Sequence, residues 1–252
     1  MPELAKGIIA TEDGLGIYLP KIRSLVIADL HLGVELALFG EGTYMPIDQY
    51  QIMQNSIINL IEKYNPESLI INGDFKHEFA RPSRQEWYEL KALSKVLSDY
   101  GVELELVRGN HDNYLKTILA REDKTLREPY YLYSDYLFVH GHQSLSEIFD
   151  TSLPEVSWVI LAHEHPAIEL RDSSGGKHKF RCYLKGTWGD YNLLVLPAYS
   201  PIASGSIINK LNGARILSPI LKDVKLEEFK PLIVDKGELL KFPKLKQLSN
   251  IQ

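Results

Sequence analysis

Residues 24–33 read SLVIADLHLG, an apolar run that ends in a polar D-x-H pair. The run Ser24–Ala28 is too short for a helix, and a short apolar run bounded by polar turn residues is typical of a buried strand. Two further runs follow the same plan. Ser68–Asn72 is followed by the dipeptide GD, and Val102–Val107 is followed by the sequence RGNHD. The sequence therefore predicts three buried strands, each ending in side chains that can carry chemistry.

Segments with helical spacing lie between these runs. Asp48–Tyr64 and Ser83–Tyr100 both place apolar residues three and four positions apart. The second segment opens with a capping box, Ser83 and Glu86, and Gly101 follows it where a left-handed C-terminal cap is expected. The alternation of strands and helices predicts parallel strands joined by right-handed crossovers.

The second half of the chain has few helical stretches and is expected to form consecutive strands. Apolar runs predict strands at Tyr136–Val139, Trp158–Ala162 and Leu193–Leu196. The stretch Ser173–Gly176 predicts a hairpin turn between the strands Ile168–Arg171 and Lys177–Leu184. A two-sheet core with helices outside is the natural assembly. We expect one domain over residues 1–252, with a poorly defined C-terminal tail from about residue 222.

The composition is that of an ordinary globular protein, with 44% apolar and 24% charged residues. There are 28 Lys and Arg against 33 Asp and Glu, a net charge of −5, so no overall basic field attracts nucleic acid or anionic lipid. Cys182 is the only cysteine, which excludes an intramolecular disulfide and a thiolate metal cage. Because no stretch has the pattern of a secretory signal or a membrane span, we expect a cytoplasmic protein that does not enter the membrane.

Five polar clusters stand where apolar runs end, and six of the eight histidines belong to them. The clusters are Asp29-Leu30-His31, Gly73-Asp74, Gly109-Asn110-His111-Asp112, His140-Gly141-His142 and His163-Glu164-His165. Side chains two apart on extended chain point to the same side, so D-x-H and H-x-H can each aim two ligands at one point. Catalytic groups of open sheets gather beyond the carboxyl ends of the strands. The placement predicts one shared site.

Taken singly, the clusters have ordinary structural interpretations. Asp29 can cap the turn after its strand, His31 can be a half-buried imidazole with satisfied hydrogen bonds, and Asp112 can be the N-cap of a helix that starts at Asn113. The histidine pairs are harder to explain without a ligand, because two unpaired imidazoles on one face are costly to desolvate. Together, the five clusters favour a shared metal site.

The ordered set of clusters resembles the calcineurin-like metallophosphoesterases. This resemblance implies an α/β fold, a four-layer α/β/β/α sandwich that holds two metal ions. It also implies that one ion is bound by Asp29, His31, Asp74 and His165. The second ion would be bound by Asp74, Asn110, His140 and His163. Ala162 departs from the family pattern, which usually has glycine before the H-x-H pair.

The donor set suits two divalent cations. Imidazole, carboxylate and amide oxygen are ligands for Mn²⁺, Fe, Co²⁺ or Zn²⁺ rather than for an ion that prefers thiolate. We expect Mn²⁺, with Fe, Zn²⁺, Co²⁺ and Mg²⁺ as alternatives. Asp74 has two oxygens and can bridge two ions, which in such sites lie about 3.5–4 Å apart. These ions lower the pKa of a bound water from 15.7 towards about 7 and so supply hydroxide for in-line attack on phosphorus.

His111 follows the expected ligand Asn110, and the matching histidine of the resembled family faces the substrate. We therefore expect His111 to stabilise the charged phosphoryl oxygens or to protonate the leaving oxygen, with Asp112 orienting its ring. Such proton transfer typically contributes 10²–10⁴-fold to the rate.

Other residues are candidates for contact with the substrate. They are His77, His142 and Arg108, together with the basic residues Lys76, Arg81, Arg84, Lys177, His178, Lys179, Arg181 and Lys185. Basic groups can flank a site and follow a phosphate backbone, and they are also common on solvated faces. The segment Gly33–Pro46, with Phe39 and Tyr44, is either a mobile cover that carries an aromatic stacking platform or ordinary packing.

A narrower resemblance is to the ICC-like phosphoesterase branch, some of whose bacterial members accompany a DNA ligase and act as nucleases. It rests on the sequences ADLHLG at Ala28, GDFKH at Gly73, AHEHP at Ala162 and LPA at Leu196. It implies DNA, RNA or another phosphodiester as substrate, and DNA-repair proteins as partners.

Three functions remain open at this point. The first is a two-metal phosphodiesterase or nuclease acting on nucleic acid or nucleotides. The second is a phosphomonoesterase acting on small metabolites or phosphoproteins. The third is a non-catalytic partner protein of the same fold. The presence of every expected ligand argues against the third, because a scaffold has no need to hold so many buried polar groups.

Overall fold

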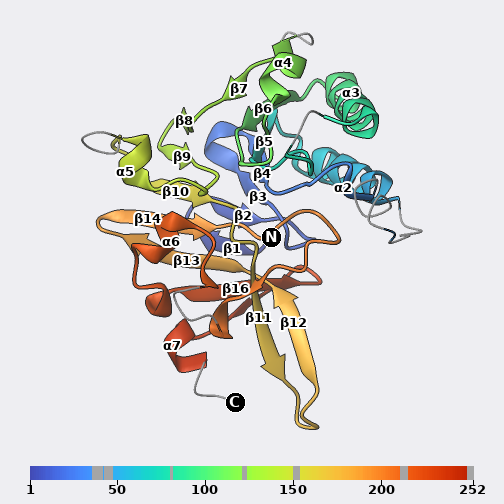
Figure 1. The fold of residues 1–252 in the computed structure, drawn as a ribbon. Helices are drawn as coiled ribbons and strands as arrows, with labels where there is room; N and C mark the ends of the chain where they lie inside the picture. Colours follow the sequence, from blue (N-terminus) through green and yellow to red (C-terminus); the bar gives the residue numbers. More distant parts are fainter. Residues whose placement is uncertain are drawn as a thin grey trace.

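Two seven-stranded sheets form the centre of the fold (Figure 1). This computed structural model describes residues 1–35, 42, 48–79, 82–120, 124–149, 154–210 and 215–248. The predicted cover Gly33–Pro46 lies mostly outside the described residues, as does Arg81. Within the described ranges, no helix has the length and apolar character needed to cross a membrane.

The first sheet joins an antiparallel half to a parallel half. Its strands in spatial order are β1 (Glu3–Ala5), β2 (Ile8–Ala10), β3 (Ile17–Leu19), β4 (Ser24–Ile27), β5 (Ser68–Asn72), β6 (Glu103–Val107) and β7 (Leu126–Arg127). Pairing is antiparallel from β1 to β4 and parallel from β4 to β7. β4, β5 and β6 are the strands predicted from the three apolar runs, and their parallel pairing is confirmed.

Two of the described α-helices are long, α2 (Gln49–Tyr64) and α3 (Arg84–Asp99). The short ones are α4 (Leu115–Leu119), α5 (Leu145–Ile148), α6 (Pro219–Lys222) and α7 (Leu245–Leu248). Asp48 caps α2 with its side chain, and the predicted capping box of α3 is present between Ser83 and Glu86. Gly101 has a φ of 69°, the left-handed conformation expected after the helix end. The helix boundaries are therefore set by the capping residues that the sequence displays.

The second sheet contains a parallel centre between antiparallel edges. Its strands in spatial order are β17 (Glu238–Lys241), β16 (Lys230–Asp235), β13 (Tyr183–Trp188), β14 (Tyr191–Val195), β10 (Trp158–Leu161), β9 (Tyr136–Phe138) and β8 (Tyr131–Tyr133). β14, β10 and β9 are parallel, and the remaining neighbours are antiparallel. The three strands predicted for the second half of the chain form this parallel centre.

Three apolar interfaces separate four layers of backbone. α2 and α3 pack on the outer face of the first sheet through residues such as Leu60 and Leu93. The second interface lies between the two sheets and includes Ile160. The third covers the outer face of the second sheet, where Leu221 of α6 and Leu245 of α7 are buried. This is the expected four-layer α/β/β/α sandwich, and burying each such leucine stabilises it by about 1.5–3 kcal/mol.

The predicted hairpin belongs to a small third sheet, and its second strand is shorter than expected. β11 (Pro166–Arg171) and β12 (Lys177–Arg181) pair antiparallel across the expected turn, and β15 (Ser206–Ile207) joins β11. The strand expected over Lys177–Leu184 is split, however, because it ends at Arg181 and the chain enters β13 of the second sheet at Tyr183. The exposed charged residues of β12 leave the core, and the buried residues that follow return to it.

The C-terminal segment is a second correction. The expectation of a poorly defined tail from about residue 222 is wrong for residues 222–248. After a short 3₁₀ turn, Leu226–Glu228, β16 pairs with β13 and β17 pairs with β16, so the segment completes one edge of the second sheet. Val234 and Leu232 bury their side chains between the sheets.

Candidate metal centre

The five polar clusters meet at one edge of the sandwich. β4, β5 and β6 are parallel in the first sheet, and β9 and β10 are parallel in the second. Each cluster begins one or two residues after the carboxyl end of one of these strands. The two sheets face each other, so the clusters converge from both sides.

Asp74 lies at the middle of the centre. Its Oδ2 is 3.4 Å from Nε2 of His140, 3.8 Å from Nε2 of His111 and 4.0 Å from Nε2 of His31. Its Oδ1 accepts a hydrogen bond of 3.0 Å from the backbone N–H of His111. One carboxylate therefore faces imidazoles that come from both sheets.

Two groups of side chains that could hold a metal ion lie around Asp74. The first contains Asp29, His31 and His165, and the second contains Asp74, His140 and His163. In each group the candidate ligand atoms all lie within 4.8 Å of one another. Asn110 joins the second group, since its Oδ1 is 3.1 Å from Nε2 of His140. The seven residues expected as ligands are thus brought together.

Several polar atoms of the centre are buried without a hydrogen-bond partner among the described residues. They include Oδ1 of Asp29 and Nδ1 of His31. Asp29 is fully buried, and its Oδ2 lies 3.4 Å from Nε2 of His165. A buried polar atom without a partner costs free energy, and a bound cation would supply that partner. These side chains therefore fit a site that holds cations. The mixture of nitrogen and oxygen donors suits a divalent transition metal.

Burial and the carboxylates act differently on the pKa values of the histidines. Burial lowers the pKa of His31 and that of His163 to about 4. Burial also opposes charge on His140, but the carboxylates of Asp74 and Asp29 outweigh it and raise its pKa to about 9. The carboxylates that favour a proton on His140 are the groups that attract a divalent cation.

The backbone of the ligand loops corrects one premise of the sequence analysis. The D-x-H and H-x-H pairs are not on extended chain, because Asp29, His31, His163 and His165 have φ values of 56°, 49°, 66° and 48°. Asp74 is likewise left-handed, at 47°. This conformation is uncommon outside glycine and is concentrated at functional sites. Hydrogen bonds hold it, since the backbone N–H of His31 donates to the carbonyl oxygen of Asp74 at 3.0 Å.

Comparison with known proteins agrees with this geometry. The family of calcineurin-like phosphoesterases matches residues 22–194, more than half of the chain. The chain belongs to the calcineurin-like phosphoesterases. It is therefore a metal-dependent phosphoric ester hydrolase, and the resemblance seen in the sequence is confirmed.

Several solved structures are similar to this phosphoesterase, and one of them has a TM-score above 0.5 among the three described next. The nuclease MPE of Pseudomonas putida is 21% identical, with a TM-score of 0.62 over 91% of this chain and 92% of that chain. Yfce, a phosphoesterase from E. coli, is 15% identical, with a TM-score of 0.43 over 73% of this chain and 83% of that one. A predicted phosphoesterase from Streptococcus pneumoniae TIGR4 is 13% identical, with a TM-score of 0.34 over 87% and 95%. No curated protein gives a significant match.

Two glycines of the phosphoesterase motifs are required by close approach. A Cβ at Gly109 would lie 2.1 Å from Oδ1 of Asp74 and 2.3 Å from its backbone nitrogen. A Cβ at Gly73 would lie 2.1 Å from Nδ1 of His140, and Gly73 has a φ of 88°. These glycines let a ligand from one motif pass over the backbone of another.

Asn72 is a residue that the sequence analysis treated only as the end of a strand. It is fully buried, and its Nδ2 donates to the carbonyl oxygens of Ile160 and Val139 at 3.0 and 3.3 Å. Its own carbonyl oxygen lies 3.1 Å from Nδ1 of His140. Asn72 therefore ties the two sheets together beside a candidate ligand. The available signal was an amide at the end of an otherwise apolar strand.

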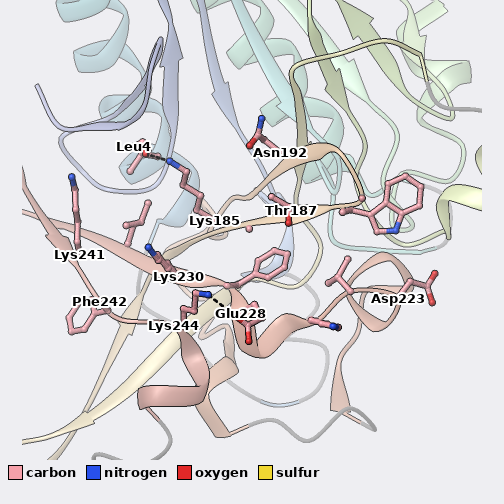
Figure 2. Close-up of a pocket in the computed structure, with 17 residues that line it drawn as sticks. Leu4, Lys185, Thr187, Asn192, Asp223, Glu228, Lys230, Lys241, Phe242 and Lys244 are labelled. Atoms are coloured by element: carbon pink, nitrogen blue, oxygen red, sulfur yellow. Dashed lines mark hydrogen bonds and ion pairs between the residues drawn. The ribbon is translucent and has the colours of Figure 1, made fainter.

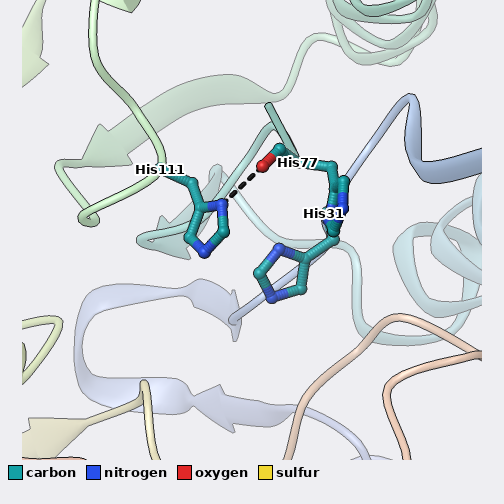
Figure 3. Close-up of side chains that lie close together, drawn as sticks. All are labelled: His31, His77 and His111. Atoms are coloured by element: carbon teal, nitrogen blue, oxygen red, sulfur yellow. Dashed lines mark hydrogen bonds between the residues drawn. The ribbon is translucent and has the colours of Figure 1, made fainter. Parts of the chain in front are cut away.

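His111 lies beside the ligands with one ring nitrogen held by the backbone. Its Nδ1 is 2.5 Å from the carbonyl oxygen of His77, as Figure 3 shows. Because a carbonyl oxygen only accepts, Nδ1 carries the proton and Nε2 faces Asp74. His31, His77 and His111 form a third group whose candidate ligand atoms lie within 4.8 Å of one another. His77 is thus at the centre rather than on a remote loop.

Phe79 is a neighbour of His111 that the sequence analysis missed. Their ring centroids are 3.7 Å apart, yet 54% of Phe79 is exposed. An exposed aromatic ring beside a polar centre offers a flat surface to an entering ligand. No periodic pattern marks such a residue, because it belongs to a loop.

Asp112 contacts other groups than the His111 ring that it was expected to orient. Its Oδ1 accepts the backbone N–H groups of Phe75 and Lys76 at 3.0 and 3.3 Å, and its Oδ2 accepts that of Gly109 at 2.8 Å. The carboxylate therefore neither orients the His111 ring nor caps a helix at Asn113. It fixes the Asp74 loop against the Asn110 loop. Burial, followed by the charge of Asp74, raises the pKa of Asp112 to about 6.

The remaining substrate candidates differ in their surroundings. His142 lies near the centre, with its ring 5.4 Å from that of His140. The guanidinium of Arg108 donates to Asn113 at 3.2 Å and to Glu128 at 3.3 Å.

Lys76 and Ala162 are both buried. Lys76 is not a surface cation flanking the site, because it is only 1% exposed and its ammonium binds the carbonyl oxygen of Glu78. Ala162, where the resembled family usually has glycine, buries its methyl group in the core between the sheets. Its backbone N–H donates to the carbonyl oxygen of His140 at 3.0 Å, so the substitution leaves the ligand loop in register.

A cavity of about 910 Å³ lies among residues outside the five polar clusters (Figure 2). It is bounded by β13, β16 and the C-terminal segment, and it contains none of the seven expected ligands. Lys185, Lys230, Lys241 and Lys244 contribute to its wall, and Lys244 pairs with Glu228 at 2.6 Å. The cavity therefore has no part in the chemistry of the His and Asp clusters.

Proposed function

We propose that this chain is a binuclear metal-dependent phosphodiesterase that hydrolyses nucleic acid or nucleotide phosphodiesters. The observation that carries the proposal is the position of Asp74. Its Oδ2 lies within 4.0 Å of Nε2 atoms of His31 and His140, which belong to the two different donor groups. A carboxylate placed between two donor groups is the arrangement that a pair of cations needs.

Seven residues would hold the ions. One group is Asp29, His31, Asp74 and His165, and the other is Asp74, Asn110, His140 and His163. We favour Mn²⁺, because imidazole, carboxylate and amide oxygens suit it. When bound, two divalent cations supply positive charge for phosphoryl oxygens and lower the pKa of water.

His111 is the candidate for proton transfer. Its Nδ1–H donates to the carbonyl oxygen of His77, so Nε2 is the atom left to face the substrate; when the ring carries a second proton, Nε2 gives it to the leaving oxygen or donates it to a phosphoryl oxygen. Asp112 supports this arrangement indirectly by fixing the backbone at Gly109. The ring of Phe79 lies against that of His111, with 3.7 Å between the centroids.

The choice of a diester rests on less direct support. The Pseudomonas putida nuclease MPE shares the fold over 91% of this chain, and the sequence resembles the ICC-like branch. An exposed aromatic ring, Phe79, also lies beside the site, and a nucleobase can stack on such a ring. A nucleic-acid substrate is therefore the class that we test first.

The test is a substrate panel with metal analysis. The protein is reconstituted with Mn²⁺ and assayed on bis-p-nitrophenyl phosphate, p-nitrophenyl phosphate, and single- and double-stranded DNA. We expect about two ions per chain and preference for the diesters. Asp74→Asn should abolish turnover and lower the metal content, whereas the matched control Asp223→Asn, at an exposed carboxylate, should change neither.

Two results would contradict the proposal. Clear preference for the monoester would favour a phosphomonoesterase. Less than about one ion per chain, with no turnover of any substrate, would favour a non-catalytic partner protein of the same fold. Equal DNA cleavage by wild type and Asp74→Asn would show that a contaminating nuclease caused the activity.

A further inference from the structure

The hairpin β11–β12 projects from the sandwich (Figure 1). β11 begins at Pro166, directly after the candidate ligand His165. The hairpin runs to a turn at Asp172, where the carboxylate accepts hydrogen bonds from the backbone N–H groups of Ser174 and Gly176. All but the last residue of β12 are exposed. The hairpin is therefore an arm that starts at the centre and ends in solvent.

One face of this arm is cationic. The antiparallel register pairs Ala167 with Arg181, Glu169 with Lys179, and Arg171 with Lys177, and directly opposed residues share a face. Glu169 is neutralised by an ion pair with Lys210. Besides the Glu169–Lys210 pair, the face carries four cations: Arg171, Lys177, Lys179 and Arg181.

The tip of this face holds an unfavourable pair. Arg171 and Lys177 are directly opposite each other, and like charges in that position destabilise a hairpin. Neither forms an ion pair with any residue in the part of the chain that the structure describes. The chain as a whole has a net charge of −5, so this density of positive charge is a local feature. An arm that keeps such a pair exposed is suited to an anionic partner.

The base of the arm is connected to the metal centre. Arg181 donates to the carbonyl oxygens of Ala198 and Pro201, at 3.2 and 2.7 Å. Between them, Ser200 donates its backbone N–H to the carbonyl oxygen of the candidate ligand Asp29 at 3.1 Å. The cationic face therefore begins one loop away from the ligands.

We propose that this face of the hairpin binds the phosphate backbone of a nucleic-acid strand and leads it to the metal centre. The inference rests on the proposed function and names the part of the molecule that recognises the polymer. From Ala167 to Arg171 the face extends about 13 Å at about 3.3 Å per residue. A single phosphate cannot contact both ends of such a face, whereas a strand with regularly spaced phosphates can. Backbone contacts of this kind position a substrate without reading its sequence.

The test neutralises the tip. The double variant Arg171→Gln with Lys177→Gln is compared with wild type and with a matched control, Lys6→Gln with Lys222→Gln, which removes the same charge outside the hairpin. Binding of Mn²⁺-loaded protein to a fluorescent phosphorothioate duplex, which keeps its charge and resists hydrolysis, is followed by anisotropy at several salt concentrations. Losing two phosphate contacts should reduce the slope of log K against log salt by about 1.8 for this duplex.

A kinetic readout accompanies the binding measurement. The ratio of kcat/KM for DNA to kcat/KM for bis-p-nitrophenyl phosphate should fall at least tenfold in the tip variant and stay at the wild-type value in the control. Thermal unfolding of the tip variant should be no earlier than that of wild type, because the substitutions remove a repulsive pair.

The outcomes separate this inference from the proposed function. If wild type cleaves DNA, and the tip variant keeps the wild-type salt slope and kcat/KM ratio, the hairpin proposal is wrong and the proposed function stands. An equal effect in the control would also refute the hairpin proposal. If wild type cleaves bis-p-nitrophenyl phosphate but neither binds nor cleaves DNA, both the hairpin proposal and the nucleic-acid substrate are refuted.

Discussion

Replacing Gly109 by alanine is a small change with a large expected effect on metal binding. Gly109 passes directly over the carboxylate that faces both donor groups. The added Cβ would lie 2.1 Å from Oδ1 of Asp74 and 2.3 Å from its backbone nitrogen. Ordinary van der Waals contact begins at 3.4 Å, so the two segments must separate by more than 1 Å.

The size of the effect follows from what must move. Overpacking of this kind typically costs about 1–3 kcal/mol in the free energy of unfolding. Moving Asp74 by about 1 Å is also enough to spoil a ligand constellation, which must be held to within about 0.5 Å. Because Asp74 serves both donor groups, both ions should be affected together.

The assay compares Gly109→Ala with a matched control. Gly189→Ala adds the same methyl group where no atom lies within 4 Å, although its φ of 55° costs a side chain about 1–2 kcal/mol. Both variants should therefore lose similar stability in urea unfolding. Only Gly109→Ala should hold less than one Mn²⁺ per chain after reconstitution and lose most of its turnover. A Gly109→Ala protein with two ions and wild-type turnover would refute the steric argument.

Three further predictions follow from the described contacts. His111→Ala should lower kcat by 10²–10⁴-fold while two ions remain bound, and unchanged turnover would contradict its role in proton transfer. Asn72→Ala should remove the amide hydrogen bonds to the carbonyl oxygens of Val139 and Ile160, which costs about 1–3 kcal/mol in urea unfolding; a loss below about 0.5 kcal/mol by the same assay would count against the tie between the sheets. Burial, reinforced by the charge of a neighbouring carboxylate, raises the pKa of Glu89 to about 7, so its folded form binds a proton more tightly than its unfolded form. Wild type should therefore lose stability relative to Glu89→Gln as the pH rises from about 4.5 through about 7, and parallel stability curves over that range would exclude this linkage.

Much of the framework could be predicted from the sequence, because local signals and global fold agree there. The apolar runs correspond to β4, β5 and β6, and the capping box at Ser83 starts α3. The parallel order follows from the alternation of strands and helices. Once the strands are parallel, the clusters after their carboxyl ends must share an edge. The convergence of the candidate ligands could be predicted for this reason, and also because the motifs resemble a known family.

The strand Lys177–Leu184 could not be placed correctly, because the pattern does not show which sheet a residue joins. The break lies between Arg181, the last residue of β12, and the buried Tyr183, the first residue of β13. The change from a charged to an apolar stretch is visible in the sequence, but only the hydrogen bonds of Arg181 to the loop at Ala198 explain why one strand becomes two.

Backbone conformation at the ligands was also beyond the sequence. A left-handed φ at Asp29 or His163 is unfavourable for a non-glycine residue, and tertiary hydrogen bonds compensate for it. Asp29 donates its backbone N–H to the carbonyl oxygen of Gly73 at 3.1 Å, and His163 donates to the Asp29 carboxylate at 3.2 Å. Asp112 is similar, because its carboxylate binds backbone groups 37 residues away rather than the next helix.

The central claim is that one aspartate, Asp74, lies between two cations. Anomalous diffraction at the manganese edge, from crystals soaked in Mn²⁺, tests it most directly. Two peaks should appear, one between Asp74 and the donors Asp29, His31 and His165, the other between Asp74 and the donors Asn110, His140 and His163. A single peak, or peaks that do not touch Asp74, would contradict it.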